Sequence, residues 1–119
     1  MKSPGLRTAI YPVTDLAQAK AFYGQLFGLS PYFDEPFYVG FEVGGYELGL
    51  IPDGKPGAAG VVAYWAVDDI QVAWQHALKV GAAALEGPKE VGGGIWVATV
   101  TDPDGNAIGW IVNPHFKLP

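Results

Sequence analysis

Hydrophobic and polar residues alternate along several short segments in the first half of the chain, which is typical of strands with one buried face. Between Asp15 and Gly28 the apolar residues instead recur at spacings of three and four, as in an amphipathic helix. Asp15 is a suitable N-cap and Gly28 a suitable end for this helix. The predicted order is β-α-β-β-β, with strands at residues 7–13, 30–35, 37–43 and 46–51 and a hairpin turn at Gly44-Gly45.

The second half repeats the same pattern. Val67-Asp68-Asp69-Ile70 matches Val13-Thr14-Asp15-Leu16, and Ile108-Gly109-Trp110-Ile111 matches Leu48-Gly49-Leu50-Ile51. A second helix is predicted from Asp69 to Gly81, so the Asp68-Asp69 pair is interpreted as a helix cap and not as a catalytic dyad. The strands of this half are expected at residues 61–67, 82–85, 95–101 and 107–112, the last two joined by a turn at residues 102–106.

These patterns predict an α+β protein built from two tandem βαβββ modules. We expect one domain over residues 1–119, with module one at residues 5–52, a linker at residues 53–60 and module two at residues 61–114. Each half is too small to bury its own sheet face, so the two modules should pack together.

Composition excludes several classes of function. The net charge is −5 and the seven basic residues are scattered, so neither nucleic acid nor an anionic membrane is an expected partner. There is no cysteine, which excludes disulfides, thiolate nucleophiles and Cys-ligated zinc. Residues 1–11 contain no apolar segment of signal-peptide length, and we expect a cytoplasmic protein.

Several of these segments together carry a family resemblance. Tyr11-Pro12-Val13-Thr14-Asp15-Leu16, the repeated helix start and the turn Asp102-Pro103-Asp104-Gly105-Asn106 resemble the vicinal oxygen chelate superfamily. That superfamily groups glyoxalase I, bleomycin-resistance proteins and extradiol dioxygenases. The resemblance implies that the two sheets form a half-open barrel around a cavity, with the helices outside and a homodimer as the usual assembly.

The resemblance also implies where a metal would be held. Metal-dependent members place ligands on the first and last strands of each module, which here correspond to Thr8 and Gly49, and to Val62 and Gly109. None of the four is a carboxylate, an imidazole or an amide, and a lone hydroxyl is a poor anchor for a divalent ion. We therefore expect no metal and no cofactor, which is closest in character to the bleomycin-resistance branch.

Strand parity predicts which side chains face the cavity. Tyr38 and Tyr64 are candidates for stacking on a flat ligand. Glu42 and Glu47 are candidates for acid–base chemistry if burial raises their pKa values, or are solvated carboxylates at the hairpin. The two glycines either widen the floor of the cavity or serve close packing. The candidate ligand-binding residues are Thr8, Tyr38, Glu42, Glu47, Gly49, Val62, Tyr64, Thr99 and Gly109, and Trp65, Trp96 and Trp110 fall on the opposite, core-facing parity.

Three functions follow from this interpretation. The leading one is a metal-free binding protein that sequesters or carries a small apolar or aromatic compound, with antibiotic resistance as a consequence. The second is an enzyme of the same superfamily, a lyase, isomerase or dioxygenase, that uses an unaligned metal site or metal-free acid–base chemistry. The third is a non-catalytic interaction module. An open cavity favours the first function, a bound divalent ion the second and a filled cavity the third.

Overall fold

The computed structural model describes residues 2–4 and 6–116. The chain forms two compact units, Met1–Pro56 and Gly57–Pro119, each with one helix and one four-stranded mixed sheet. The predicted α+β class and the two βαβββ modules are confirmed. The expected start of module one, residue 5, lies outside the described residues.

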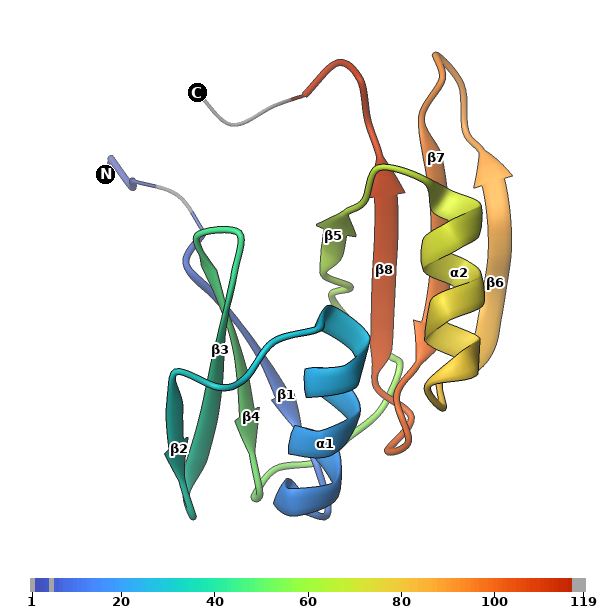
Figure 1. Ribbon diagram of the computed structural model, residues 1–119. Coiled ribbons are helices and arrows are strands. Elements are labelled where there is room, and N and C mark those ends of the chain that lie inside the picture. The colour runs from blue at the N-terminus through green and yellow to red at the C-terminus, as the bar shows by residue number, and fades with distance from the viewer. Residues whose placement is uncertain (1, 5, 117–119) are drawn as a thin grey trace. The chain divides into compact units, whose positions relative to one another are not determined.

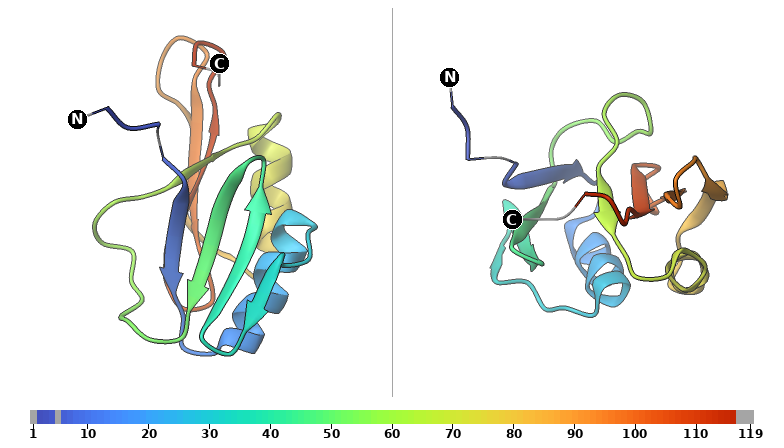
Figure 2. Two further views of the ribbon diagram at one scale, coloured as in Figure 1. Left: turned by 90° about the vertical axis from the view of Figure 1, so that its left-hand side faces the viewer. Right: turned by 90° about the horizontal axis from the view of Figure 1, so that it is seen from above.

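The first unit contains one helix beside a sheet in the order β1-β4-β3-β2 (Figure 1). Strand β1 runs parallel to β4, and the other neighbouring pairs are antiparallel. Figure 2 shows the helix behind this sheet when the sheet faces the viewer. The elements are β1 (Thr8–Pro12), α1 (Leu16–Phe27), β2 (Phe33–Glu35), β3 (Tyr38–Val43) and β4 (Tyr46–Ile51).

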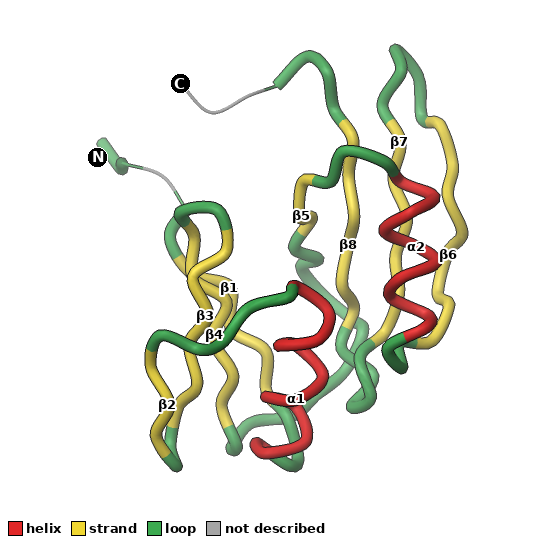
Figure 3. Tube along the Cα trace, in the orientation of Figure 1, coloured by secondary structure: helices red, strands yellow, loops and turns green. Residues whose placement is uncertain are grey.

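The second unit repeats this arrangement with the order β5-β8-β7-β6 (Figure 3). Strands β5 and β8 are parallel, and helix α2 packs against β6, β7 and β8. Asp102 closes the turn before β8, because its carboxylate accepts hydrogen bonds from the backbone N–H groups of Asp104 and Asn106. The elements are β5 (Tyr64–Ala66), α2 (Ile70–Lys79), β6 (Ala83–Glu90), β7 (Trp96–Thr101) and β8 (Ala107–Val112).

Side chains alternate across the first sheet as the sequence predicts. One face is apolar and packs toward α1, where a set of large side chains is fully or nearly fully buried: Tyr11, Tyr23, Val39, Phe41, Leu48 and Leu50. The opposite face carries Thr8, Ile10, Glu42 and Glu47, and Ile10 is 53% exposed. Burial of the apolar side chains stabilises the sheet. The opposite, exposed face is where a functional site can lie.

The tryptophans of the second unit follow the predicted parity with one difference. Trp65 and Trp110 are 9% and 3% exposed, as expected of core residues. Trp96 is 37% exposed. It is the first residue of β7, directly after the loop that contains Gly92, Gly93 and Gly94, all with positive φ angles.

Three strands differ most from the prediction. Strand β2 begins at Phe33 and not at residue 30. Strand β6 is longer than expected and continues through Gly87 and Pro88, because an edge strand tolerates both residues where its register shifts. Strand β5 is shorter and begins at Tyr64.

Aspartate caps begin both helices, as predicted. Asp15 accepts a hydrogen bond from the backbone N–H of Gln18 at 3.0 Å. Asp69 accepts from the N–H groups of Gln71 and Val72 at 3.0 and 3.1 Å. Gly28 ends α1 in the left-handed conformation, with φ of 66°.

The Asp69 cap is expected to contribute measurably to stability. Asp69→Ala should lower the free energy of unfolding by about 1 kcal/mol, because two helical N–H groups lose their acceptor. Urea denaturation followed by circular dichroism measures this change. Asp68→Ala is the matched control, since it removes the same charge at the neighbouring exposed position. Equal losses in the two variants would contradict the cap.

Candidate functional site

The carboxylate of Glu47 accepts hydrogen bonds from three hydroxyl groups on the exposed face of the first sheet. Thr8 Oγ1 and Tyr38 Oη donate to Glu47 Oε1 at 2.9 and 2.8 Å. Tyr32 Oη donates to Glu47 Oε2. Thr8 lies opposite Glu47 in the register of β1 and β4, while Tyr38 comes from β3 and Tyr32 from the segment before β2. The cluster therefore joins every part of this sheet.

Gly40 provides the space for this cluster. A Cβ atom at residue 40 would lie 2.8 Å from Glu47 Oε2, 3.0 Å from the Tyr32 ring and 3.3 Å from the Tyr38 ring. The carboxylate and both rings thus converge over a backbone position that has no side chain. The Tyr32 backbone N–H donates to the Gly40 carbonyl at 2.9 Å, which places Tyr32 beside this strand.

The hydrogen bonds determine the charge of the cluster. The bond from Tyr32 is the main reason why the pKa of Glu47 is lowered, and the bonds from Tyr38 and Thr8 add to it against the opposing effect of burial. Burial first, and then the bond to Glu47, raises the pKa of Tyr38 to about 12. The same carboxylate raises the pKa of Tyr32. At neutral pH Glu47 is therefore ionised and both phenols keep their protons.

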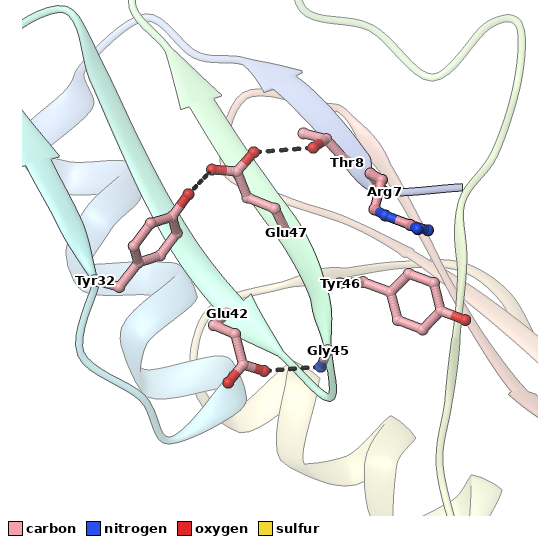
Figure 4. A pocket seen from close by; sticks show the side chains of 7 residues that line it. All are labelled: Arg7, Thr8, Tyr32, Glu42, Gly45, Tyr46 and Glu47. Carbon is pink, nitrogen blue, oxygen red and sulfur yellow. Dashed lines mark hydrogen bonds between the residues drawn. The ribbon is translucent and has the colours of Figure 1, made fainter. Parts of the chain in front are cut away.

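An open depression of about 320 Å³ lies beside Glu47 (Figure 4). Glu42, a second carboxylate on its wall, turns away from Glu47 and accepts a hydrogen bond from the Gly45 N–H at 2.8 Å. The guanidinium of Arg7 also points away from Glu47 and donates to the carbonyls of Pro4 and Leu6, both at 3.2 Å. The depression is lined by Arg7, Thr8, Tyr32, Glu42, Gly45, Tyr46 and Glu47.

The space above Gly49 is filled by a tyrosine ring. A Cβ atom there would lie 2.7 Å from Tyr38 Cζ, so this glycine serves a close approach and does not widen an empty floor. The second unit uses the same arrangement, since a Cβ at Gly109 would lie 2.5 Å from Tyr64 Cδ1. A carboxylate ligand at either position would require its tyrosine to move. The four positions that correspond to family metal ligands therefore do not fit a bound metal.

The predicted site residues form two groups, one on each sheet. In the first unit Thr8, Tyr38 and Glu47 are in direct contact, Glu42 lies on the same depression, and Gly49 lies under Tyr38. In the second unit Gly109 pairs with Tyr64 on β5 and with Thr99 on β7, while Val62 precedes β5 and is half-buried.

The sequence interpretation missed Tyr32, whose bond has the largest effect on Glu47. It also missed Arg7, Gly45 and Tyr46, which line the depression. In the sequence, Tyr32 is an aromatic residue directly before an edge strand, and the neighbouring strand contains Gly40. This pattern points to Tyr32 only when Phe33, the residue after Tyr32, is known to pair with Gly40.

Neither a metal-binding cluster nor a membrane-spanning helix occurs among the described residues. Within residues 2–4 and 6–116, no three His, Asp or Glu side chains gather closely enough to hold a metal ion. No helix in that same part of the chain has the length and apolar character needed to cross a membrane.

Comparison with known proteins agrees with this architecture. The sequence profile of the Glyoxalase/Bleomycin resistance protein/Dioxygenase superfamily matches residues 5–109, so the chain belongs to that superfamily. Among solved structures, a glyoxalase-related enzyme from Fulvimarina pelagi is 18% identical with a TM-score of 0.81, over 98% of this chain and 94% of that one. A glyoxalase/bleomycin resistance protein from Catenulispora acidiphila is 24% identical with a TM-score of 0.72, over 92% and 100%. At these identities the structures establish a shared fold. None of the curated proteins compared with this chain matches it.

The titration of Glu47 tests the hydrogen-bond network. Tyr32→Phe should raise the pKa of Glu47, because it removes the main group that lowers this pKa. Carbon-13 NMR of the Glu side-chain carboxyls across acidic pH measures the midpoint. Tyr46→Phe is the control, since Tyr46 lines the same depression without a bond to Glu47 in the described structure. Equal midpoints in the two variants would contradict the network.

The same network implies a pH dependence of stability. Since folding lowers the pKa of Glu47 below its ordinary value of 4.5, its stabilising effect is present above that pH and is lost as the pH falls through the folded value. Tyr32→Phe should therefore reduce the loss of stability on acidification.

Proposed function

We propose that this protein is a metal-independent small-molecule-binding protein of the bleomycin-resistance type, which sequesters or carries a small apolar or aromatic compound. The proposed binding surface is the exposed face of the first sheet around Glu47. Val62, Tyr64, Thr99 and Gly109 of the second unit remain predicted ligand-binding residues. Cytoplasmic residence and resistance to a drug-like compound are part of this proposal.

The depression beside Glu47 is the observation that carries the proposal. It is of the size expected for a small-molecule site, and it combines aromatic walls with a few oriented polar groups. The rings of Tyr32 and Tyr46 offer apolar faces, while the ionised Glu47 and the hydroxyl of Thr8 provide polar contacts. This composition supports binding of a flat organic molecule.

The titration behaviour of the cluster favours binding over acid–base catalysis. A general base that works at neutral pH needs a pKa near 7, but the pKa of Glu47 is lowered from an ordinary value already below that range. A phenolate nucleophile or base is equally disfavoured, since the pKa of Tyr38 is about 12. The hydrogen bonds to Glu47 lower its pKa, and they therefore oppose the hypothesis that burial prepares Glu47 for acid–base chemistry.

The side chains at the four positions that correspond to family metal ligands support a function that does not depend on a metal. Thr8 and Val62 provide one hydroxyl and one alkyl group, and Gly49 and Gly109 provide no side chain. The hydroxyl of Thr8 is already used as a donor to Glu47. A divalent ion bound at these positions would lack the carboxylate and imidazole ligands that it prefers.

We expect the protein to form a homodimer. Half of the residues are hydrophobic and only 16% are charged, so a chain of this size has little polar surface with which to cover its apolar faces. Light scattering at tens of micromolar should give twice the chain mass of 12.6 kDa. A mass equal to one chain would reject the dimer.

Binding of small aromatic compounds to chelator-treated protein tests the proposed function. Nitrogen-15 NMR with a set of aromatic fragments should shift the backbone signals of Thr8, Tyr32 and Glu47, and added chelator should leave the shifts unchanged. Gly40→Ala should weaken binding about tenfold or more, because its methyl group displaces the Glu47 carboxylate and the Tyr32 ring.

Gly57→Ala is the matched control for that experiment, because its methyl group meets nothing within 4 Å. It should bind like the original protein. If Gly40→Ala also kept full affinity, the site would lie elsewhere. If no fragment shifted any signal on this sheet, the interaction-module hypothesis would replace the binding hypothesis.

A further inference from the structure

Glu42 and Glu47 occupy opposite positions on β3 and β4 next to their hairpin turn. They are direct partners in the antiparallel register, and directly opposed residues have Cβ atoms about 5 Å apart. Like charges at such positions destabilise a sheet. This like-charged pair therefore requires a physical explanation.

No cation of the described chain neutralises this pair. Between described side chains, the ion pair within 4 Å is Lys20 with Asp34, which involves neither glutamate. Arg7 lines the same depression, but its guanidinium donates to two backbone carbonyls and points away from Glu47 (Figure 4). The lining carries two carboxylates and one guanidinium, and its net charge is negative.

The hydrogen bonds of Glu47 limit what else it can accept. A carboxylate offers about four acceptor positions. Two on Oε1 are used by Thr8 and Tyr38, and one on Oε2 is used by Tyr32. One acceptor position remains on Oε2, so Glu47 can bind one further N–H donor. A divalent metal ion requires several oxygen ligands at once, which this occupied carboxylate cannot supply.

Tyr32, whose hydroxyl donates to Oε2, begins a cluster of aromatic rings that suits an organic cation. Tyr32 is 63% exposed, and its ring lies 6.5 Å from that of Phe33. Phe33 in turn makes edge contacts with Phe37 at 6.1 Å and with Tyr38 at 6.0 Å. Aromatic faces attract cations and cover the flat body of a ligand, while a carboxylate orients the charged group.

We propose that the depression binds a flat organic cation, with its amidinium, guanidinium or amine group on Glu47 Oε2 and its apolar body against Tyr32, while Glu42 adds a second negative charge to the same lining. This inference rests on the proposed function and adds the charge and shape of the ligand. An amidinium or guanidinium group suits this lining particularly well, because its positive charge balances the net negative charge of the lining and one of its N–H groups can donate to Glu47 Oε2.

A matched set of probes separates this inference from the proposed function. Benzamidine is a flat cation, benzamide has nearly the same shape without charge, and guanidinium has the charge without the ring. Calorimetry or NMR titration at low salt should show benzamidine binding at least about tenfold more tightly than either of the others, and its affinity should fall as salt is added. If benzamide bound as tightly, the cation inference would be wrong while the binding function stood. If none of the three bound, both would fail.

Charge-removing variants locate the cation. Glu47→Gln should weaken benzamidine binding about tenfold or more and should weaken benzamide binding by a smaller factor, because the amide keeps the size of the side chain and removes its charge. Glu42→Gln should have a smaller effect in the same direction. Thermal unfolding shows whether each variant is folded, and Gly40→Ala, which retains both charges, provides a second way to disturb the site.

Asp53→Asn is the control for these variants. It removes the same charge from an exposed position six residues along the chain from Glu47, beyond the other end of β4, whose residues 47–51 alone span about 13 Å. It should leave benzamidine affinity unchanged. Equal weakening by Asp53→Asn and Glu47→Gln would show a general charge effect and overturn the site. Displacement of benzamidine by stoichiometric Mn²⁺ would overturn the organic-cation assignment.

Discussion

The site depends on one carboxylate that holds three hydroxyl groups in place. Glu47 lies on β4, and its donors come from β1, from β3 and from the segment before β2. The side chains on this face can therefore be arranged as they are only when all four strands are in register. The bonds that orient Tyr32 and Tyr38 also keep the carboxylate ionised. The same hydrogen bonds therefore determine both the positions of the two tyrosines and the charge of Glu47.

Glycine makes that arrangement possible on a crowded sheet. Gly40 and Gly49 are direct partners across β3 and β4, and the rings of Tyr32 and Tyr38 occupy space that side chains at these two positions would need. The second unit has the same arrangement, with the ring of Tyr64 over Gly109. At both Gly49 and Gly109, glycine supplies no metal ligand and leaves space for an aromatic ring.

Local features of the sequence predicted the fold well. The caps at Asp15 and Asp69 depend on residues two or three positions away, and the alternation on β3 and β4 depends on nearest neighbours. Strand β6 was underestimated because Gly87 and Pro88 indicate a turn unless the strand is known to lie at an edge. The candidate set included Thr8, Tyr38 and Glu47 because parity alone places them on one face. Tyr32 was missed because its bond spans 15 positions and depends on the space at Gly40.

The crystal structure of the complex with benzamidine is the most direct test of the central claim, which is that the Glu47 cluster is the binding centre. The account predicts the amidinium within hydrogen-bond distance of Glu47 Oε2 and the phenyl ring against Tyr32, with Thr8 and Tyr38 still bonded to Oε1. A benzamidine molecule bound away from this sheet face, with the Glu47 cluster unchanged and unoccupied, would contradict it.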